Sequence, residues 1–205
     1  FGDDPTSVDY ERIFYARRPI LETAVKNFLV NQSLQADFNH FEKNNRLWLE
    51  DFAEFMAIKE HFGNQALQKW DDKKAVARDP KTLEKYRTML VDQIQYFKVT
   101  QYFFFKQWGE LKDYANQRGI KIIGDMPIYV AADSVEVWTK PELFQLDKER
   151  NPLFVAGVPA DQFSATGQLW GNPLYDWEEH KKQGYTWWIH RIEESFKIYD
   201  VLRID

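Results

Sequence analysis

Two short apolar runs, each directly after a helical pattern, constrain the fold of this chain more than any other feature. The run at residues 120–124 follows a long helix that Gly119 would end, and residues 201–205 follow an amphipathic helix over residues 187–199. A short apolar run after a helix is typical of a buried parallel strand. The alternation of helix and strand therefore predicts an α/β fold whose parallel strands are joined by crossover helices.

The first 78 residues are predicted to be helical. Pro19 is typical of a helix start, and apolar residues follow it with a period of 3.6. A second helix is indicated around Leu34 and Phe38, and a third over residues 47–62, which Gly63 would end. Residues 64–78 are polar and predict a connection.

Asp79 and Pro80 form a good helix start, because a capping carboxylate precedes a proline at the first helical position. A helix from there to Arg118 would approach about 60 Å in length. We therefore expect a break, near the β-branched pair Val99 and Thr100. The aromatic residues of this predicted helical region are expected mostly in the core, namely Tyr102, Phe103, Phe105 and Trp108.

Residues 125–176 are rich in glycine, proline, aspartate and aromatic residues and are predicted to form a long loop. Within it, residues 143–146 and 153–155 could pair as a small hairpin. Loops of this length are uncommon in compact domains and are often functional.

The residues at the two predicted strand ends could carry chemistry. Arg203 and Asp205 lie two positions apart, so their side chains point to the same face of a strand. A carboxylate beside a guanidinium suits a glycosidase nucleophile, because the positive charge favours the ionised carboxylate. Asp125 ends the other strand and could bind a sugar hydroxyl. The alternatives are a salt-bridged aspartate at position 205 and an aspartate that caps loop amides at position 125.

Residues 155–173 form the most unusual segment of the sequence. Their glycines and prolines could hinge and stiffen a lid. Asp161 and Gln168 could bind hydroxyl groups, and Trp170 offers a flat face to a sugar ring. An irregular surface loop anchored by a buried tryptophan explains the pattern equally well.

Composition excludes several classes of function. The chain has no cysteine, a net charge of −5 and no basic stretch that would mark a nucleic-acid interface. No apolar run reaches the roughly 18 residues of a membrane span. The four histidines show no metal-ligand spacing, so we expect no metal site. The absence of cysteine fits a reducing compartment, and we expect a cytoplasmic protein. Both ends resemble cut ends, because the chain begins with Phe1 and stops within a strand.

Several motifs, taken in order, resemble those of the 4-α-glucanotransferases of the amylomaltase or disproportionating-enzyme type, glycoside hydrolase family 77. The resemblance covers essentially the whole chain and is densest from residue 119 onward. The motifs are Gly124-Asp125-Met126-Pro127-Ile128-Tyr129-Val130, Ala132-Asp133-Ser134, Val137-Trp138, Val155-Ala156-Gly157-Val158-Pro159, Ser164-Ala165-Thr166-Gly167-Gln168-Leu169-Trp170-Gly171-Asn172-Pro173-Leu174-Tyr175 and Arg203-Ile204-Asp205.

The resemblance implies a (β/α)₈ barrel, of which residues 79–205 would form part, and a helical insertion at residues 1–78. It also implies site residues: Asp205 as catalytic nucleophile, Arg203 beside it, Asp125 near the transferred sugar, and Asp161, Gln168 and Trp170 on a mobile loop over the donor glucan. The family's motif continues beyond the aspartate, and its general-acid glutamate lies further on. No residue of this chain is assigned that role.

Three functions remain open from the sequence. The resemblance favours retaining transfer of α-1,4-glucan segments between malto-oligosaccharides, with no cofactor and with the remainder of the barrel as partner. A fragment that only binds glucan, or only folds, is the second possibility. A hydrolase of the related α-amylase type is the third.

Overall fold

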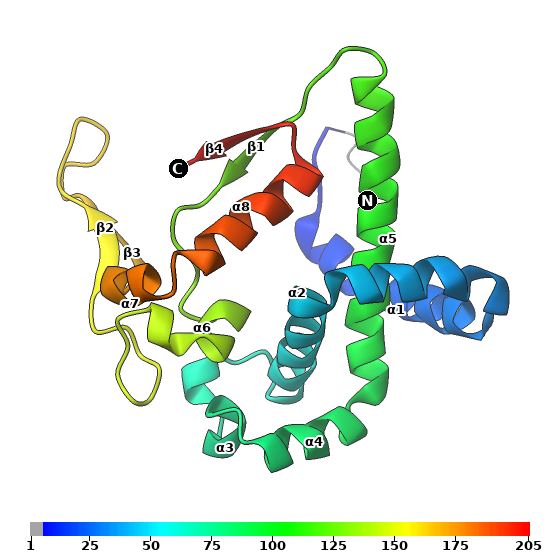
Figure 1. Ribbon diagram of the computed structural model, residues 1–205, viewed down its shortest axis with the longest axis horizontal. Helices are drawn as coiled ribbons and strands as arrows, with labels where there is room; N and C mark the ends of the chain where they lie inside the picture. The colour runs from blue at the N-terminus through cyan, green and yellow to red at the C-terminus, as the bar shows by residue number, and fades with distance from the viewer. Residues whose placement is uncertain (1–5) are drawn as a thin grey trace.

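A computed structural model describes residues 6–205; residues 1–5 of the predicted helical region lie outside the described residues. Two long helices, α2 (Gln35–His61) and α5 (Val91–Asn116), pack against each other, and α1 (Tyr10–Val30) lies against α5. Short strands and helices occupy the other side of the molecule (Figure 1). The remaining elements before the first strand are η1 (Gln32–Leu34), η2 (Leu67–Lys69), α3 (Lys73–Val76) and α4 (Pro80–Met89).

Helices α1 and α2 differ from the sequence prediction in two ways. Helix α1 begins after Asp9, whose carboxylate accepts a hydrogen bond from the Arg12 amide at 2.9 Å, so Pro19 lies inside the helix and not at its start. The second and third predicted helices are one continuous helix, α2. Gly63 follows it with a φ of 68°, which confirms the predicted stop.

The long helical region after Asp79 is broken at Leu90, not at Val99 and Thr100. Asp79 caps α4 by accepting from the Thr82 amide at 2.9 Å, as predicted. Leu90 then leaves the helical conformation, with φ −111° and ψ 25°, and α5 starts at the next residue. Val99 instead lies fully buried inside α5.

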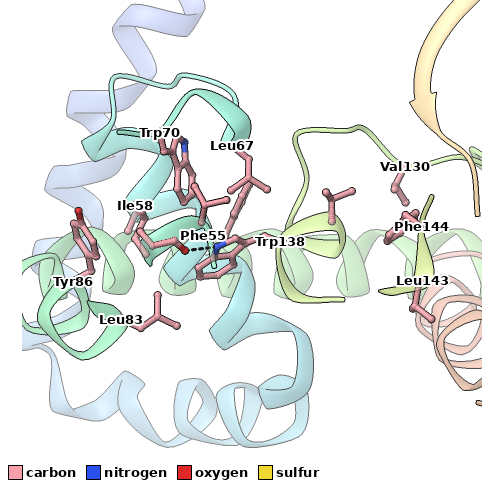
Figure 2. Close-up of a cluster of buried hydrophobic side chains, with 14 of the residues drawn as sticks. Phe55, Ile58, Leu67, Trp70, Leu83, Tyr86, Val130, Trp138, Leu143 and Phe144 are labelled. Atoms are coloured by element: carbon pink, nitrogen blue, oxygen red, sulfur yellow. Dashed lines mark hydrogen bonds between the residues drawn. The ribbon is translucent and has the colours of Figure 1, made fainter. Parts of the chain in front are cut away.

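Two clusters of buried side chains form the core. The smaller cluster joins α1, α2 and α5 through Val25, Phe28, Phe38, Tyr96, Val99 and Tyr102. The larger cluster centres on Trp70 and Trp138, whose rings lie together with Phe55 between α2 and α6 (Val135–Thr139) in Figure 2. It contains residues from both sides of position 78, so the predicted helical insertion and the later part share one core.

Two parallel strands form a sheet, as predicted, but the first begins three residues later than the predicted run at residues 120–124. Strand β1 (Ile123–Met126) pairs in parallel with β4 (Val201–Ile204), and Asp125 lies opposite Arg203 in the register. Helix α8 (Thr186–Ile198) contacts both strands. The expectation of a buried strand is wrong for one face, because Gly124 and Met126 are buried while Ile123 is 70% exposed.

Residues 125–176 are not a structureless loop. They contain α6, the short helix η3 (Pro141–Leu143) and an antiparallel hairpin of β2 (Val155–Val158) and β3 (Gln168–Pro173). The predicted hairpin is reduced to a single bridge between Leu146 and Pro152, because Phe144 pairs with Tyr175 instead. Helix α7 (Trp177–Lys182), which the sequence did not predict, then leads into α8.

Candidate active site

Arg203 joins two carboxylates at the ends of β1 and β4. Its Nε donates to Asp125 Oδ1 at 3.0 Å, and its Nη2 bonds to Asp125 Oδ2 as well. The same Nη2 donates to Asp205 Oδ2 at 3.0 Å. The structure thus brings together three of the predicted site residues, Asp125, Arg203 and Asp205, in one array.

The backbone of the two strands explains this array. Asp125 and Arg203 are register partners, so their side chains emerge on the same face of the sheet. Asp205 is two residues beyond Arg203 and shares that face. Its amide donates to Met126 O at 3.1 Å, and its main-chain oxygen accepts from the Ile128 amide at 2.6 Å. The main chain of Asp205 is therefore hydrogen-bonded to the last residue of β1 and to Ile128 just after that strand.

The array is charged and open to solvent. The hydrogen bonds from Arg203 hold the pKa of Asp125 below its usual value, and the pKa of Arg203 is raised mainly by Asp125 and then by Asp205. The side chains of Arg203 and Asp205 are 63% and 73% exposed.

Two residues that the sequence did not single out hold the start of β4. Asp200 accepts hydrogen bonds from the Ile122 amide and from Asn116 Nδ2, both at 2.8 Å. Lys112 on α5 donates to the main-chain oxygen of Tyr199 at 3.1 Å and pairs with Asp200. No local pattern points to these residues, because their contacts depend on how α5 packs beside the sheet.

The other three predicted site residues lie on the β2–β3 hairpin, which projects from one end of the molecule (Figure 1). Asp161 accepts from the amides of Phe163 and Ser164 at 2.8 Å, so its carboxylate holds the turn. Trp170 Nε1 donates to Gln168 Oε1 at 3.0 Å. No hydrogen bond or ion pair within residues 6–205 joins these three side chains to the array at the strand ends.

The hairpin also exposes two apolar side chains that sequence reasoning missed, Phe163 at its tip, which is 85% exposed, and Leu169. The predicted site residue Trp170 is half exposed beside them. The signal was present in the sequence, because an apolar residue amid glycines and polar residues of a turn has no core position to fill. The hairpin therefore presents an uncovered apolar face at its tip.

A cavity of about 740 Å³ lies away from the array. It is lined by residues of α2, α5, α6 and α8, among them Trp48, Phe105 and Trp187. Asp125, Arg203 and Asp205 do not line it. The array thus occupies an open sheet end and not an enclosed pocket of this chain.

The histidines do not form a metal site. His180 is buried among the rings of Tyr175, Trp177 and Trp187, which is a structural position. Within residues 6–205, no group of three or more histidine, aspartate or glutamate side chains is placed to hold a metal ion. No helix in the same range is long and apolar enough to cross a membrane.

Comparison of the sequence with those of known proteins shows which family it resembles. A family model described as 4-alpha-glucanotransferase matches residues 2–205. The 4-alpha-glucanotransferase of Streptococcus pneumoniae is 56% identical to the whole chain, which covers 40% of that protein. The 4-alpha-glucanotransferase of Clostridium butyricum is 45% identical over 206 residues, and the chain covers 42% of it.

A solved structure matches the fold over the full chain. It is titled amylomaltase from Streptococcus agalactiae in complex with acarbose, and its sequence is 60% identical. The TM-score is 0.96, with 100% of this chain and 41% of that protein covered. The chain therefore spans about two fifths of the length of the relatives it matches.

Proposed function

This chain belongs to the 4-alpha-glucanotransferase family, glycoside hydrolase family 77, and from that membership we propose that the protein transfers segments of α-1,4-linked glucan between malto-oligosaccharides. The single observation that carries the proposal is the array in which Arg203 joins Asp125 and Asp205 at the ends of two adjacent parallel strands. Catalytic residues of (β/α)₈ barrels lie at this end of their strands.

We propose that β1 and β4 are neighbouring strands of such a barrel, with residues 79–205 as part of it and residues 1–78 as a helical insertion. The parallel pairing of β1 and β4, with α8 against both strands, supports this assignment. The remaining strands would come from a polypeptide of the relatives' length, which we call the full-length enzyme. The remainder of the barrel is then the structural partner of this chain.

The proposed reaction proceeds with retention. An oxygen of the Asp205 carboxylate forms a bond to the anomeric carbon of the donor glucan, and the bond from that carbon to the glycosidic oxygen breaks. The departing oxygen takes a proton from a general acid, a role that we assign to no residue of this chain. The products are a shortened glucan and a covalent glycosyl ester on Asp205.

Arg203 would serve both halves of this reaction. Its hydrogen bond to Asp205 Oδ2 fixes one oxygen of the carboxylate, which orients the other toward the sugar. The same cation stabilises the carboxylate as it departs from the sugar in the second step. Asp125 binds two nitrogens of Arg203, so it would hold the guanidinium in place and offer oxygen atoms to a sugar hydroxyl.

In the second step, the 4-hydroxyl of an acceptor glucan attacks the anomeric carbon. Its proton passes to the group that acted as the acid, and the bond to Asp205 breaks. Water would give hydrolysis instead, so transfer requires that water be excluded while the ester exists. We assign this role to the β2–β3 hairpin, with Asp161 holding its turn and Gln168 and Trp170 facing the donor glucan. The exposed apolar tip of the hairpin supports this assignment.

The partners in this proposal are malto-oligosaccharides or other α-1,4-glucans, and the acarbose complex of the S. agalactiae amylomaltase supports a ligand of that class. Nucleic acids and membranes are not among the expected partners. The reaction as written uses acid–base and nucleophilic groups alone and requires no cofactor. A cytoplasmic location stays a prediction.

Replacement of Asp205 by asparagine in the full-length enzyme tests the nucleophile. Asparagine keeps the shape but cannot form the ester, so we expect glucose release from maltotriose to fall by about 10³-fold or more, the scale seen when a residue of a covalent step is removed. The matched control is Asp113→Asn on the exposed face of α5, which should leave the rate unchanged. Undiminished glucose release by Asp205→Asn would refute the assignment.

The products of the same assay separate the remaining functions. A transferase conserves the number of reducing ends, whereas an α-amylase-type hydrolase increases it with every turnover. Constant reducing ends with glucose release support transfer, and a steady increase contradicts it. Glucan binding without either product would favour a non-catalytic protein.

A further inference from the structure

Two side chains far from β1 in sequence, Tyr175 and Arg191, bind the main-chain oxygens just after that strand. Tyr175 Oη donates to Ile128 O at 2.6 Å and accepts from Arg191 Nη1 at 3.1 Å. Arg191 Nη2 donates to Pro127 O at 2.6 Å. Tyr175 and Arg191 thus hold two consecutive carbonyl groups, and we refer to the pair as the clamp.

The segment held by the clamp is the one that holds Asp205. The amide of Ile128 donates to the main-chain oxygen of Asp205 at 2.6 Å, while its carbonyl is bound by Tyr175. One residue earlier than the clamped Pro127, Met126 accepts from the Asp205 amide at 3.1 Å. The main chain at residues 126–128 therefore lies between the clamp and the proposed nucleophile, and any shift of it moves both.

The clamp itself is well supported by its surroundings. Tyr175 is 1% exposed, and its ring stacks on Tyr129 and touches Phe144 and Trp187. The Arg191 guanidinium lies 5.2 Å from the centre of the Trp187 ring, which restricts its motion. A side chain held this closely can position its hydrogen-bond partners accurately.

The clamp also joins the base of the β2–β3 hairpin to the same segment. Tyr175 follows β3 by two residues, and Asn172 within β3 donates to Val130 O at 2.8 Å. The hairpin strand and the segment after β1 are therefore connected at Val130 and again at Ile128. A change in the conformation of the hairpin base would reach Asp205 through these bonds.

We propose that Tyr175 and Arg191 are positioning residues that set the place of Asp205 through the main chain of Pro127 and Ile128. This inference rests on the proposed function, because it concerns Asp205 as the nucleophile. Neither residue touches the substrate in the proposal. Their effect is on the geometry of attack, to which covalent catalysis is sensitive at the scale of 1 Å.

Tyr175→Phe in the full-length enzyme tests the clamp, because it removes only the hydroxyl and keeps the ring in the core. We expect kcat for maltotriose disproportionation to fall about tenfold, while KM changes less than about twofold, since the loss concerns the reacting geometry and not glucan binding. The matched control, Tyr114→Phe on the half-exposed face of α5, should change neither constant.

Arg191→Lys is the second variant. Lysine keeps the charge but lacks the planar fork that reaches Pro127 and Tyr175 together, so we expect a similar loss. Because both residues serve one clamp, the double variant should lose about as much as each single variant, not the product of the two losses. If Tyr175→Phe does not fold, Arg191→Lys alone decides.

Hydrogen exchange of the Ile128 and Asp205 amides gives a readout that is independent of activity. Both amides should exchange at least about tenfold faster in Tyr175→Phe than in the wild type, with no such change in Tyr114→Phe. A reduced unfolding temperature with normal kcat and normal exchange at these amides would overturn the proposal. So would independent, multiplying losses in the double variant.

The proposed function fails in a different way. An inactive wild-type enzyme, or full activity in Asp205→Asn, would refute the nucleophile and leave the clamp variants to be judged by exchange alone. Faster exchange at Ile128 and Asp205 would then support the clamp as a main-chain restraint, and unchanged exchange would overturn it.

Discussion

Gly124 sets how closely β1 approaches the end of α8. A Cβ atom added at this position would lie 2.0 Å from Cδ2 of the Tyr199 ring, far inside van der Waals contact. Tyr199 in turn packs edge-on against Trp108 of α5, so its ring has little room to move. The glycine is therefore required by close approach of a side chain and not by its own backbone conformation.

We expect Gly124→Ala to lower the free energy of unfolding by about 1–3 kcal/mol, the usual cost of overpacking a core. Gly109→Ala is the control, because no atom lies within 4 Å of its added Cβ and the residue is inside α5. Alanine is favoured over glycine there by about 1 kcal/mol, so the control should stabilise the protein. Urea unfolding of both variants measures the difference; equal stabilities would contradict the overpacking argument.

His180 should make the stability of the protein depend on pH. It is 1% exposed, and burial lowers its pKa below the ordinary value of 6.5 despite the nearby Asp176 and Glu179. The unfolded chain therefore takes up a proton at a higher pH than the folded protein does. The stabilising contribution of neutral His180 is complete above pH 6.5 and is lost as the pH falls from there toward the folded-state pKa.

Unfolding in urea at several pH values between 7 and 5 measures this effect. We expect the free energy of unfolding to decrease more steeply with falling pH in the wild type than in His180→Gln. The control is His40→Gln, an exposed position on α2, which should keep the wild-type slope. Equal slopes in the wild type and His180→Gln would show that His180 titrates alike in the folded and unfolded states.

The candidate site was predictable at the residue scale only in part. Side chains of a strand alternate between its two faces, so the sequence alone indicates that Arg203 and Asp205 share a face. The bidentate contact between Arg203 and Asp125 depends on the register of two strands, which no local pattern encodes. Tyr175 and Arg191 are further removed, because they reach the site only through main-chain atoms of a third segment.

At the scale of elements, α1 contains a proline where the sequence predicted a helix start. Proline in a helix interior lacks the amide for one hydrogen bond and is less favourable than alanine by about 3 kcal/mol. Pro19 is exposed, so its ring contributes little packing that would offset this cost.

We therefore expect Pro19→Ala to stabilise α1 by up to about 3 kcal/mol, measured as slower hydrogen exchange of the amides of this helix. Ala16→Pro, at another exposed position of α1, is the matched opposite change and should destabilise the helix. Faster exchange in Pro19→Ala would mean that the proline supports the helix through contacts of its ring.

Elements with strong end signals were predicted best. The Asp79 cap, the Gly63 stop and the helix and strand near the end of the chain all appear close to their predicted positions. The break at Leu90 has no such signal, since neither glycine nor proline marks it, and the buried Leu90 side chain packs in the larger core cluster. The β2–β3 hairpin was missed for a related reason: its strands lie further apart in sequence than a tight turn would allow.

At the scale of the whole molecule, one core extends across the predicted domain boundary at residue 78. The larger cluster contains Phe55 and Trp70 as well as Trp138 and Trp187, so side chains before and after position 78 are buried against one another. The division of the chain at that position stays a prediction. The sequence indicates a change along the chain, from helical patterns to segments rich in glycine and proline. Tertiary contacts such as these follow no local sequence pattern.

The pairing of β1 with β4 has a consequence for how the chain reaches its native state. Asp125 and Arg203 are 78 residues apart in sequence, whereas the long helices form from neighbouring residues. Contacts between distant residues carry a larger loop-closure cost and form slowly. The array of Asp125, Arg203 and Asp205 should therefore be assembled late, after the intervening helices and hairpin have folded, so its geometry depends on every element that lies between its two strands.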